Sequence, residues 1–186
     1  MQKTGTRRLE TPRLILRRFS SDDAVDMYRN WAADPEVTRF LTWPCHASPE
    51  ATRALLENWE AQYENGGYFS WAIEHKDIHQ VIGSISVVNL NEEIDAAEIG
   101  YCLSRKHWGQ GFMPEALIAV MHYLFDEVGI NRISARHDVN NPNSGRVMEK
   151  AGMKYEGRLR QAGRNNQGIC DIILRAALRK EWNIAE

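Results

Sequence analysis

The feature that most constrains the fold is a strand–helix–strand unit between residues 96 and 139. Residues 96–103 and 131–139 have the pattern of strands, and the longest predicted helix, about Gly109 to Val128, lies between them. The apolar positions of this helix recur at helical spacing and are Met113, Leu117, Val120 and Leu124. Strands joined by a helical crossover lie parallel, so we expect these two to be parallel neighbours.

Further strands and helices are expected on either side of this unit. The other predicted strands are residues 13–19, 68–74, 80–90, 153–159 and 169–177, and the other helices are residues 21–34, a segment from Pro49 to the Gly66-Gly67 pair, and residues 142–151. The order predicts an α/β (α+β) fold with one mixed, mostly antiparallel sheet of about seven strands. Helices are expected on both faces of the sheet, and no linker or low-complexity segment divides the chain.

Length and charge limit the classes of function. A chain of 186 residues suits one domain rather than two. Lys and Arg number 23 and Asp and Glu 25, and this slight excess of acid argues against a nucleic-acid partner held by bulk charge. The longest apolar run, residues 116–121, is too short to cross a membrane, so no membrane partner is expected.

The ends of the chain and its cysteines bear on localisation. No apolar stretch follows the basic residues near the N-terminus, so no secretory signal is predicted. The three cysteines are far apart and fit neither a disulfide framework nor a zinc site. His75 and His79 have a spacing known from helical zinc motifs, but they fall at a predicted strand turn, so no metal is expected. We therefore expect a cytoplasmic protein.

A glycine-rich turn leads into the predicted long helix. Gly109 and Gly111 follow the basic residues 105–107 and precede the first helical turn. Free backbone N–H groups and the helix dipole make such a place suitable for a phosphate, and glycine lets an anion approach closely. Pro114 excludes the dinucleotide fingerprint, and no Gly-Lys-Ser/Thr follows for a P-loop. The alternative is a plain tight turn.

Four segments in order resemble one family. The strand EIGYCL (residues 98–103) followed by KHWGQG (residues 106–111) resembles the acetyl-CoA motif of the GNAT N-acetyltransferases, with Lys106 where the family has Gln or Arg. NPNSGRVMEKAGM (residues 141–153) is similar to the second signature of that family. ETPRLILR (residues 10–17) and residues 171–182 resemble the ribosomal-protein (Rim-type) branch.

The resemblance implies an activity and a domain plan. A GNAT domain over residues 10–182 would follow an N-terminal extension (residues 1–9) and precede a tail (residues 183–186). It would move an acetyl group from acetyl-CoA to a primary amine by direct attack in a ternary complex. The favoured acceptor is a protein N-terminal α-amine. A small amine such as a polyamine or a drug is the alternative, and a non-catalytic acyl-CoA-binding regulator is a further one. A homodimer is compatible with the resemblance.

The resemblance also implies which residues hold acetyl-CoA. The pyrophosphate would sit on the glycine turn, and the pantetheine would follow a strand of a splayed parallel pair. The residues expected to bind the cosubstrate are Cys102, Leu103, Lys106, Trp108, Gly109, Gln110, Gly111, Phe112, Met113 and Asn141.

Two catalytic residues are expected. Glu98 is the candidate base for the amine, directly or through water, and the alternative is a surface glutamate. The family often has a tyrosine four residues after the position of Ser144, but here that residue is Met148, which cannot donate a proton. Ser144 is therefore the candidate partner of the leaving thiolate, with helix capping as its alternative. The Leu103 backbone is the candidate oxyanion donor.

Three further features remain open. Cys102 lies near the expected thioester, but a small buried residue is a better reading than a nucleophile. Trp43 is a candidate wall of the acceptor pocket, with core packing as the alternative. The polar segment of residues 161–168 is predicted to be a mobile loop that frames the acceptor channel.

Overall fold

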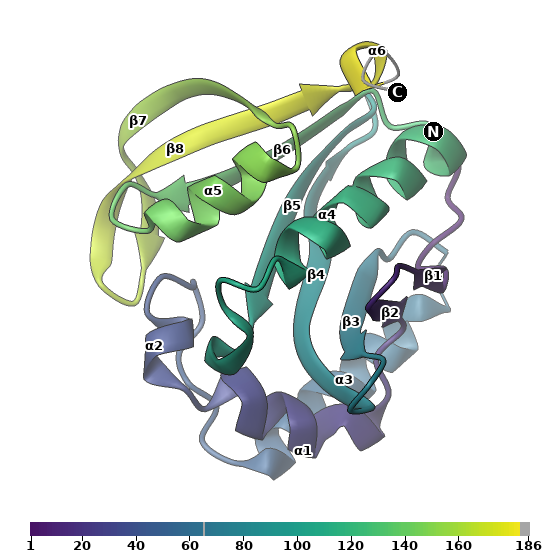
Figure 1. Cartoon of the computed structure of the whole chain (residues 1–186), viewed down its shortest axis with the longest axis vertical. Helices are drawn as coiled ribbons and strands as arrows, with labels where there is room; N and C mark the ends of the chain where they lie inside the picture. The colour runs from purple at the N-terminus through teal and green to yellow at the C-terminus, as the bar shows by residue number, and fades with distance from the viewer. Residues whose placement is uncertain (65, 183–186) are drawn as a thin grey trace.

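A single mixed sheet organises the chain. The computed structural model describes residues 1–64 and 66–182, so the expected tail at residues 183–186 lies outside the described residues. The sheet has eight strands in the order β1-β2-β3-β4-β5-β6-β8-β7 (Figure 1). They are β1 (Leu9–Glu10), β2 (Leu14–Arg17), β3 (Ser70–His75), β4 (Gln80–Asn91), β5 (Ala96–Leu103), β6 (Arg132–Asp138), β7 (Lys154–Asn165) and β8 (Gly168–Leu178). The expected number of about seven is corrected by β1, whose two residues are too few for a periodic signal.

The expected parallel pair is β5 with β6, and all other neighbouring strands are antiparallel. The two strands are paired only from Ala96 to Glu98, opposite Arg132 to Ser134. Beyond that point β5 stays with β4 as far as Leu103, and β6 stays with β8 as far as Asp138. The strands therefore diverge and leave a wedge in the middle of the sheet (Figure 1).

Helices cover both faces of the sheet. They are α1 (Ala24–Met27), α2 (Pro35–Thr38), α3 (Pro49–Tyr63), α4 (Phe112–His122), α5 (Pro142–Lys150) and α6 (Arg179–Trp182). The first core cluster packs α4 and α5 against the sheet face that carries Trp71 and Ile73. The second packs α1, α2 and α3 against the face that carries Ala72 and Val81. No helix of the described residues combines the length and apolar character that crossing a bilayer requires.

Two predicted helices differ in detail. The helix expected over residues 21–34 is broken into the 3₁₀ turn Ser21–Asp23, α1 and the π-helical turn Tyr28–Ala32. The helix expected from Gly109 begins at Phe112, because Gly109 and Gly111 have φ of 75° and 82°, outside the helical range. Its last part, Tyr123–Val128, is π-helical.

The prediction of a mobile loop at residues 161–168 is wrong. This segment is the end of β7 and the turn into β8, and the hairpin tip is anchored to the loop after α2. Asn166 N donates to Leu41 O at 3.1 Å, and its Nδ2 donates to Thr38 O and Trp43 O, each at 2.8 Å. The expectation failed because an edge strand facing water is polar and lacks an apolar stripe.

Residues 1–9 pack against the domain. Gln2 N donates to Val128 O at 2.7 Å, and Thr6 Oγ1 donates to Tyr68 O and accepts from Ser70 N. Leu9 lies in β1.

The packing of α5 against β6 generates a stability prediction. A Cβ on Gly145 would lie 2.6 Å from Nε2 of His137, whose Nδ1 is held by Asp138 O at 2.8 Å. The imidazole is buried and hydrogen-bonded, so it cannot easily give way. We expect Gly145→Ala to lower the free energy of unfolding by about 1–3 kcal/mol, the usual cost of overpacking. Chemical denaturation measures this.

Gly157→Ala in β7 is the matched control. A Cβ there would meet no heavy atom within 4 Å, so we expect a change within about 0.5 kcal/mol. Equal stability of the Gly145 variant and the wild type would contradict the close approach of α5 to β6.

Candidate functional site

The glycine turn lies between the end of β5 and the start of α4. A 3₁₀ turn, Arg105–His107, follows β5, and Trp108 Nε1 donates to Leu103 O at 2.8 Å. Gly109 and Gly111 then have left-handed backbones, and a Cβ on Gly109 would meet nothing within 4 Å. The glycine is therefore required by the backbone conformation rather than by crowding. No side chain caps α4, so its first N–H groups remain free for an anion.

The charge of the turn comes from two of its three basic residues. Arg105 is paired with Asp34 at 3.0 Å, and Lys106 is exposed. Burial, together with His75 and Lys106 nearby, lowers the pKa of His107, so this imidazole is largely neutral at pH 7. Because Asp34 offsets the charge of Arg105, the turn combines a helix N-terminus with the unpaired charge of Lys106 among the described residues, which suits a diphosphate.

Arg13, near the start of the chain, supports the turn through contacts that the sequence did not predict. Its Nη1 donates to Gln110 O at 2.9 Å, and its guanidinium lies 4.2 Å from the centre of the Phe112 ring. In a trans peptide the N–H points opposite to the carbonyl. Holding the Gln110 carbonyl toward Arg13 therefore turns the Gly111 N–H the other way, toward the open side of the turn.

Glu115, in the first turn of α4, holds Arg13 in place. It accepts from the Arg13 backbone at 3.0 Å, from Arg13 Nε at 2.7 Å and from Thr11 Oγ1 at 2.6 Å. Burial alone would raise the pKa of Glu115, but these hydrogen bonds outweigh it and lower the pKa, so the carboxylate is ionised at pH 7. The segment of residues 10–17 that resembles the Rim branch contains Arg13, and its partner 102 residues away is visible only in the fold.

The wedge separates the two predicted catalytic residues. Alternation along β5 places Glu98 and Cys102 on the α1–α3 face and Tyr101 on the α4 face, where it packs against the first core cluster. Glu98 is 18% exposed, and its Oε1 accepts from Arg136 Nε at 2.6 Å. Ser144 lies in α5, on the opposite face from Glu98. A reaction that uses both residues has to take place within the wedge.

Asn141 and Ser144 occupy the start of α5. Asn141 is the N-cap, and its Oδ1 accepts from Ser144 N at 3.4 Å. The capping alternative for Ser144 is thus wrong, because Asn141 fills that role. The Ser144 hydroxyl faces Tyr101, with 3.1 Å between the two oxygens. Met148 is 1% exposed and packs in the first core cluster.

Cys102 is a protonated thiol. Its Sγ is 3.2 Å from Ser84 Oγ, and burial raises its pKa to about 11. A thiol in this state is a weak nucleophile at neutral pH. The geometry therefore favours the packing interpretation.

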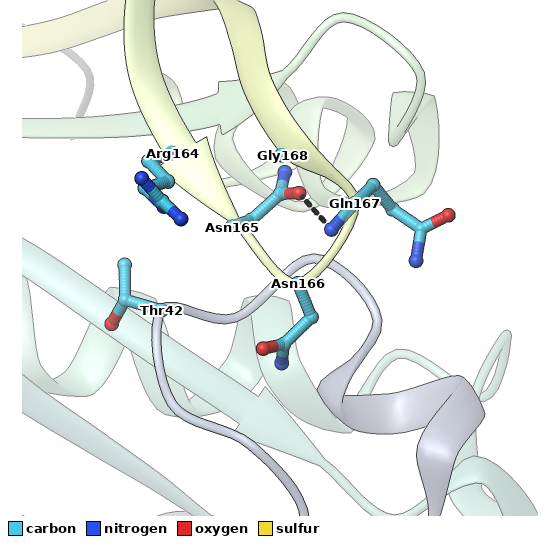
Figure 2. Close-up of a pocket in the computed structure, with 6 residues that line it drawn as sticks. All are labelled: Thr42, Arg164, Asn165, Asn166, Gln167 and Gly168. Atoms are coloured by element: carbon cyan, nitrogen blue, oxygen red, sulfur yellow. Dashed lines mark hydrogen bonds between the residues drawn. The ribbon is translucent and has the colours of Figure 1, made fainter.

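An open pocket lies between the hairpin tip and the loop after α2 (Figure 2). Its volume is about 580 Å³, and it is lined by Thr42, Arg164, Asn165, Asn166, Gln167 and Gly168. Asn165 ties the tip to the end of β6, since its Nδ2 donates to Asp138 Oδ2 at 2.7 Å. Trp43 contributes its carbonyl to the Asn166 anchor, while its ring packs against His46 and the second core cluster.

The two histidines with metal-like spacing do not converge. His75 packs against the rings of His107 and Phe112, and His79 is 81% exposed. Among residues 1–64 and 66–182, no three His, Cys, Asp or Glu side chains are grouped as metal ligands. The expected cosubstrate residues from Lys106 to Met113 do share one turn, with Asn141 and Ser144 across the wedge.

The chain is similar to known acetyltransferases. The model of the acetyltransferase (GNAT) domain family matches residues 13–154. The chain is 35% identical over 153 residues to the uncharacterised N-acetyltransferase YoaA of Bacillus subtilis, covering 82% of this chain and 86% of that protein. It is 32% identical over 139 residues to the ribosomal-protein-serine acetyltransferase of Escherichia coli, covering 74% and 76% respectively.

A solved structure shares the fold. A ribosomal L7/L12 α-N-protein acetyltransferase in complex with coenzyme A superposes with a TM-score of 0.82 at 23% identity, covering 92% of this chain and 98% of that one.

The brace on the glycine turn generates a second prediction. We expect Arg13→Met to weaken acetyl-CoA affinity about tenfold, as for the loss of one charge-assisted hydrogen bond of about 1.5 kcal/mol. Calorimetric titration with acetyl-CoA measures this. Arg8→Met is the control, because Arg8 pairs with Glu10 at 2.8 Å, away from the glycine turn, and both side chains are more than half exposed. Unchanged affinity in a folded Arg13 variant would show that the turn needs no brace.

Proposed function

We propose that this chain, which belongs to the GNAT acetyltransferase family, acetylates the N-terminal α-amine of a protein. Acetyltransferases of this family use acetyl-CoA. The observation that carries the proposal is the combination of a free helix N-terminus at Gly111 with the wedge between β5 and β6. The first suits a diphosphate, and the second leaves the β5 edge beyond Glu98 without a strand partner in the described residues.

The residues fit acetyl-CoA along its length. The free amides of α4 and the Lys106 charge suit the pyrophosphate. Beyond Glu98, the edge of β5 that faces β6 has no strand partner in the described residues. Its backbone groups near Cys102 and Leu103 can therefore pair with the amides of the pantetheine, as a further strand would.

The acceptor amine has to be neutral to attack. The amine nitrogen forms a bond to the thioester carbonyl carbon, the C–S bond breaks, and the thiolate carries the electron pair away. Glu98 is the proposed base, and it accepts the amine proton directly or through one water. Its Oε1 is held by Arg136, which fixes the carboxylate at the mouth of the wedge. Ser144 donates a hydrogen bond to the leaving thiolate, and the Leu103 amide is proposed to do so to the oxyanion.

Two arguments favour an α-amine over a lysine-like amine. Reference pKa values of about 7.7–8.0 and 10.4 leave the α-amine more than about a hundredfold richer in neutral form at pH 7. The pocket beside Asn165 and Asn166 is polar and lies where two loops meet, and the side-chain amide of Gln167, which lines it, can pair with a peptide backbone. The name of the Escherichia coli relative, a ribosomal-protein-serine acetyltransferase, agrees with a protein as the acceptor.

A panel of acceptors tests this proposal. Release of free thiol from acetyl-CoA is followed with short peptides of varied first residue, with the same peptides N-formylated, and with spermidine. We expect free peptides to react, with kcat/KM about a hundredfold above that of spermidine. Formylation, which removes the amine and little else, should abolish the reaction. Preference for spermidine would support the small-amine alternative, and acetyl-CoA binding without thiol release would support a regulator.

Glu98→Gln tests the proposed base. We expect kcat to fall about a hundredfold at pH 7, a typical loss for a general base. The deficit should shrink above pH 8, because the α-amine then deprotonates without help. Glu93→Gln, an exposed residue of the turn before β5, is the control. A deficit that is the same at every pH would exclude Glu98 as the base.

A further inference from the structure

We propose that Tyr101 is a positioning residue for the acetyl transfer, which holds the Ser144 hydroxyl at the wedge so that it can stabilise the leaving thiolate. The inference rests on the proposed function and adds a residue to its machinery. It is carried by one contact that spans the two halves of the sheet.

Tyr101 bridges the wedge where the strands have already separated. It lies three residues beyond Glu98, the last residue of β5 that is paired with β6. Its hydroxyl donates to Ser144 O at 2.9 Å and lies 3.1 Å from Ser144 Oγ. The link therefore joins β5 to the first turn of α5, on the face opposite Glu98.

The number of protons fixes the direction of these hydrogen bonds. A phenol has one proton, and Tyr101 gives it to the Ser144 carbonyl. The second contact is then a bond in which the Ser144 hydroxyl donates to the Tyr101 oxygen. The serine proton is thus held toward Tyr101 until a stronger acceptor arrives, and the hydroxyl has one defined orientation.

Relative acidity shows that Tyr101 does not supply the proton itself. Burial raises the pKa of Tyr101 above its ordinary value, whereas a free thiol has a pKa near 8.5. Transfer of the phenol proton to a thiolate would therefore be uphill. When the C–S bond breaks, the sulfur keeps the electron pair, and the Ser144 hydroxyl turns its hydrogen bond toward the sulfur. The thiolate leaves as an anion, and solvent protonates it afterwards.

The residue one turn after Ser144 in α5 cannot take this role. Met148 lies one turn after Ser144, is 1% exposed and carries no proton to donate. Among the described residues, Tyr101 is the side chain whose hydroxyl contacts both oxygens of Ser144. Ser144 and Tyr101 together therefore supply the hydrogen bond to the leaving thiolate that Met148 cannot donate.

A double-mutant cycle tests the role. We expect Tyr101→Phe, which keeps the ring, to lower kcat about tenfold, equivalent to about 1.4 kcal/mol, with KM for acetyl-CoA changed less than about threefold. Ser144→Ala should lose at least as much. The double variant should lose no more than Ser144→Ala alone, because Tyr101 acts through Ser144. Additive losses, an unchanged kcat, or an effect confined to KM would overturn the inference.

Tyr123→Phe is the matched control. Tyr123 is a buried tyrosine of the first core cluster, against which Tyr101 also packs, and its hydroxyl donates to Gly5 O at 2.6 Å, away from the wedge. We expect this variant to lose stability in thermal unfolding but to keep its kcat. An equal fall of kcat in both tyrosine variants would indicate a general effect of packing and overturn the inference.

A binding experiment separates this inference from the proposed acceptor. The affinities of CoA and of desulfo-CoA, which lacks the thiol, are compared by calorimetry from pH 7 to about 9.5, across the thiol pKa near 8.5. In the wild type the ratio should shift in favour of CoA as the thiol ionises, and in Tyr101→Phe it should stay nearly flat. A flat ratio in the wild type would overturn the inference. A rising ratio without thiol release from any amine would instead refute the proposed function alone.

Discussion

In the part of the chain that the structure describes, strand pairing joins the two halves of the sheet at three residue pairs of β5 and β6. The first half, β1 to β5, carries the glycine turn, and the second, β6 to β8, leads to α5 and to the hairpin tip. Longer pairing would occupy the edge of β5 beyond Glu98, which has no strand partner in the described residues. Shorter pairing would leave the position of one half of the sheet relative to the other less well fixed. Everything proposed about catalysis depends on this balance.

Other interactions compensate for the short pairing at separate points. Tyr101 links β5 to α5 on one face, and the ion pair of Glu98 with Arg136 links β5 to β6 on the other. At the far end, Asn166 joins the hairpin tip to the loop after α2. Arg13 has a similar role along the chain, because it connects the first strands to the turn before α4. The geometry of the wedge therefore depends on side-chain contacts as well as on the pairing of β5 with β6.

The sequence predicted what depends on local pattern and failed where polar side chains meet over long distances. The strand at residues 96–103 was predicted to the residue, and α3 was found because Pro49 follows a capping serine. The parallel crossover followed from chain order alone. The segment at residues 161–168 was misread, because the strand at a solvent-facing edge is polar. The brace by Arg13 could not be predicted, since nothing in one sequence pairs it with a glutamate 102 residues away.

The way Asn166 holds the hairpin tip has a consequence for how such an enzyme can diverge. Its partners are the main-chain carbonyls of Thr38, Leu41 and Trp43, and every residue type offers the same carbonyl. The side chains of that loop are therefore free to vary without loss of the anchor. Under the proposed function, acceptor preference can therefore change through substitutions at these positions while the frame around the pocket stays in place.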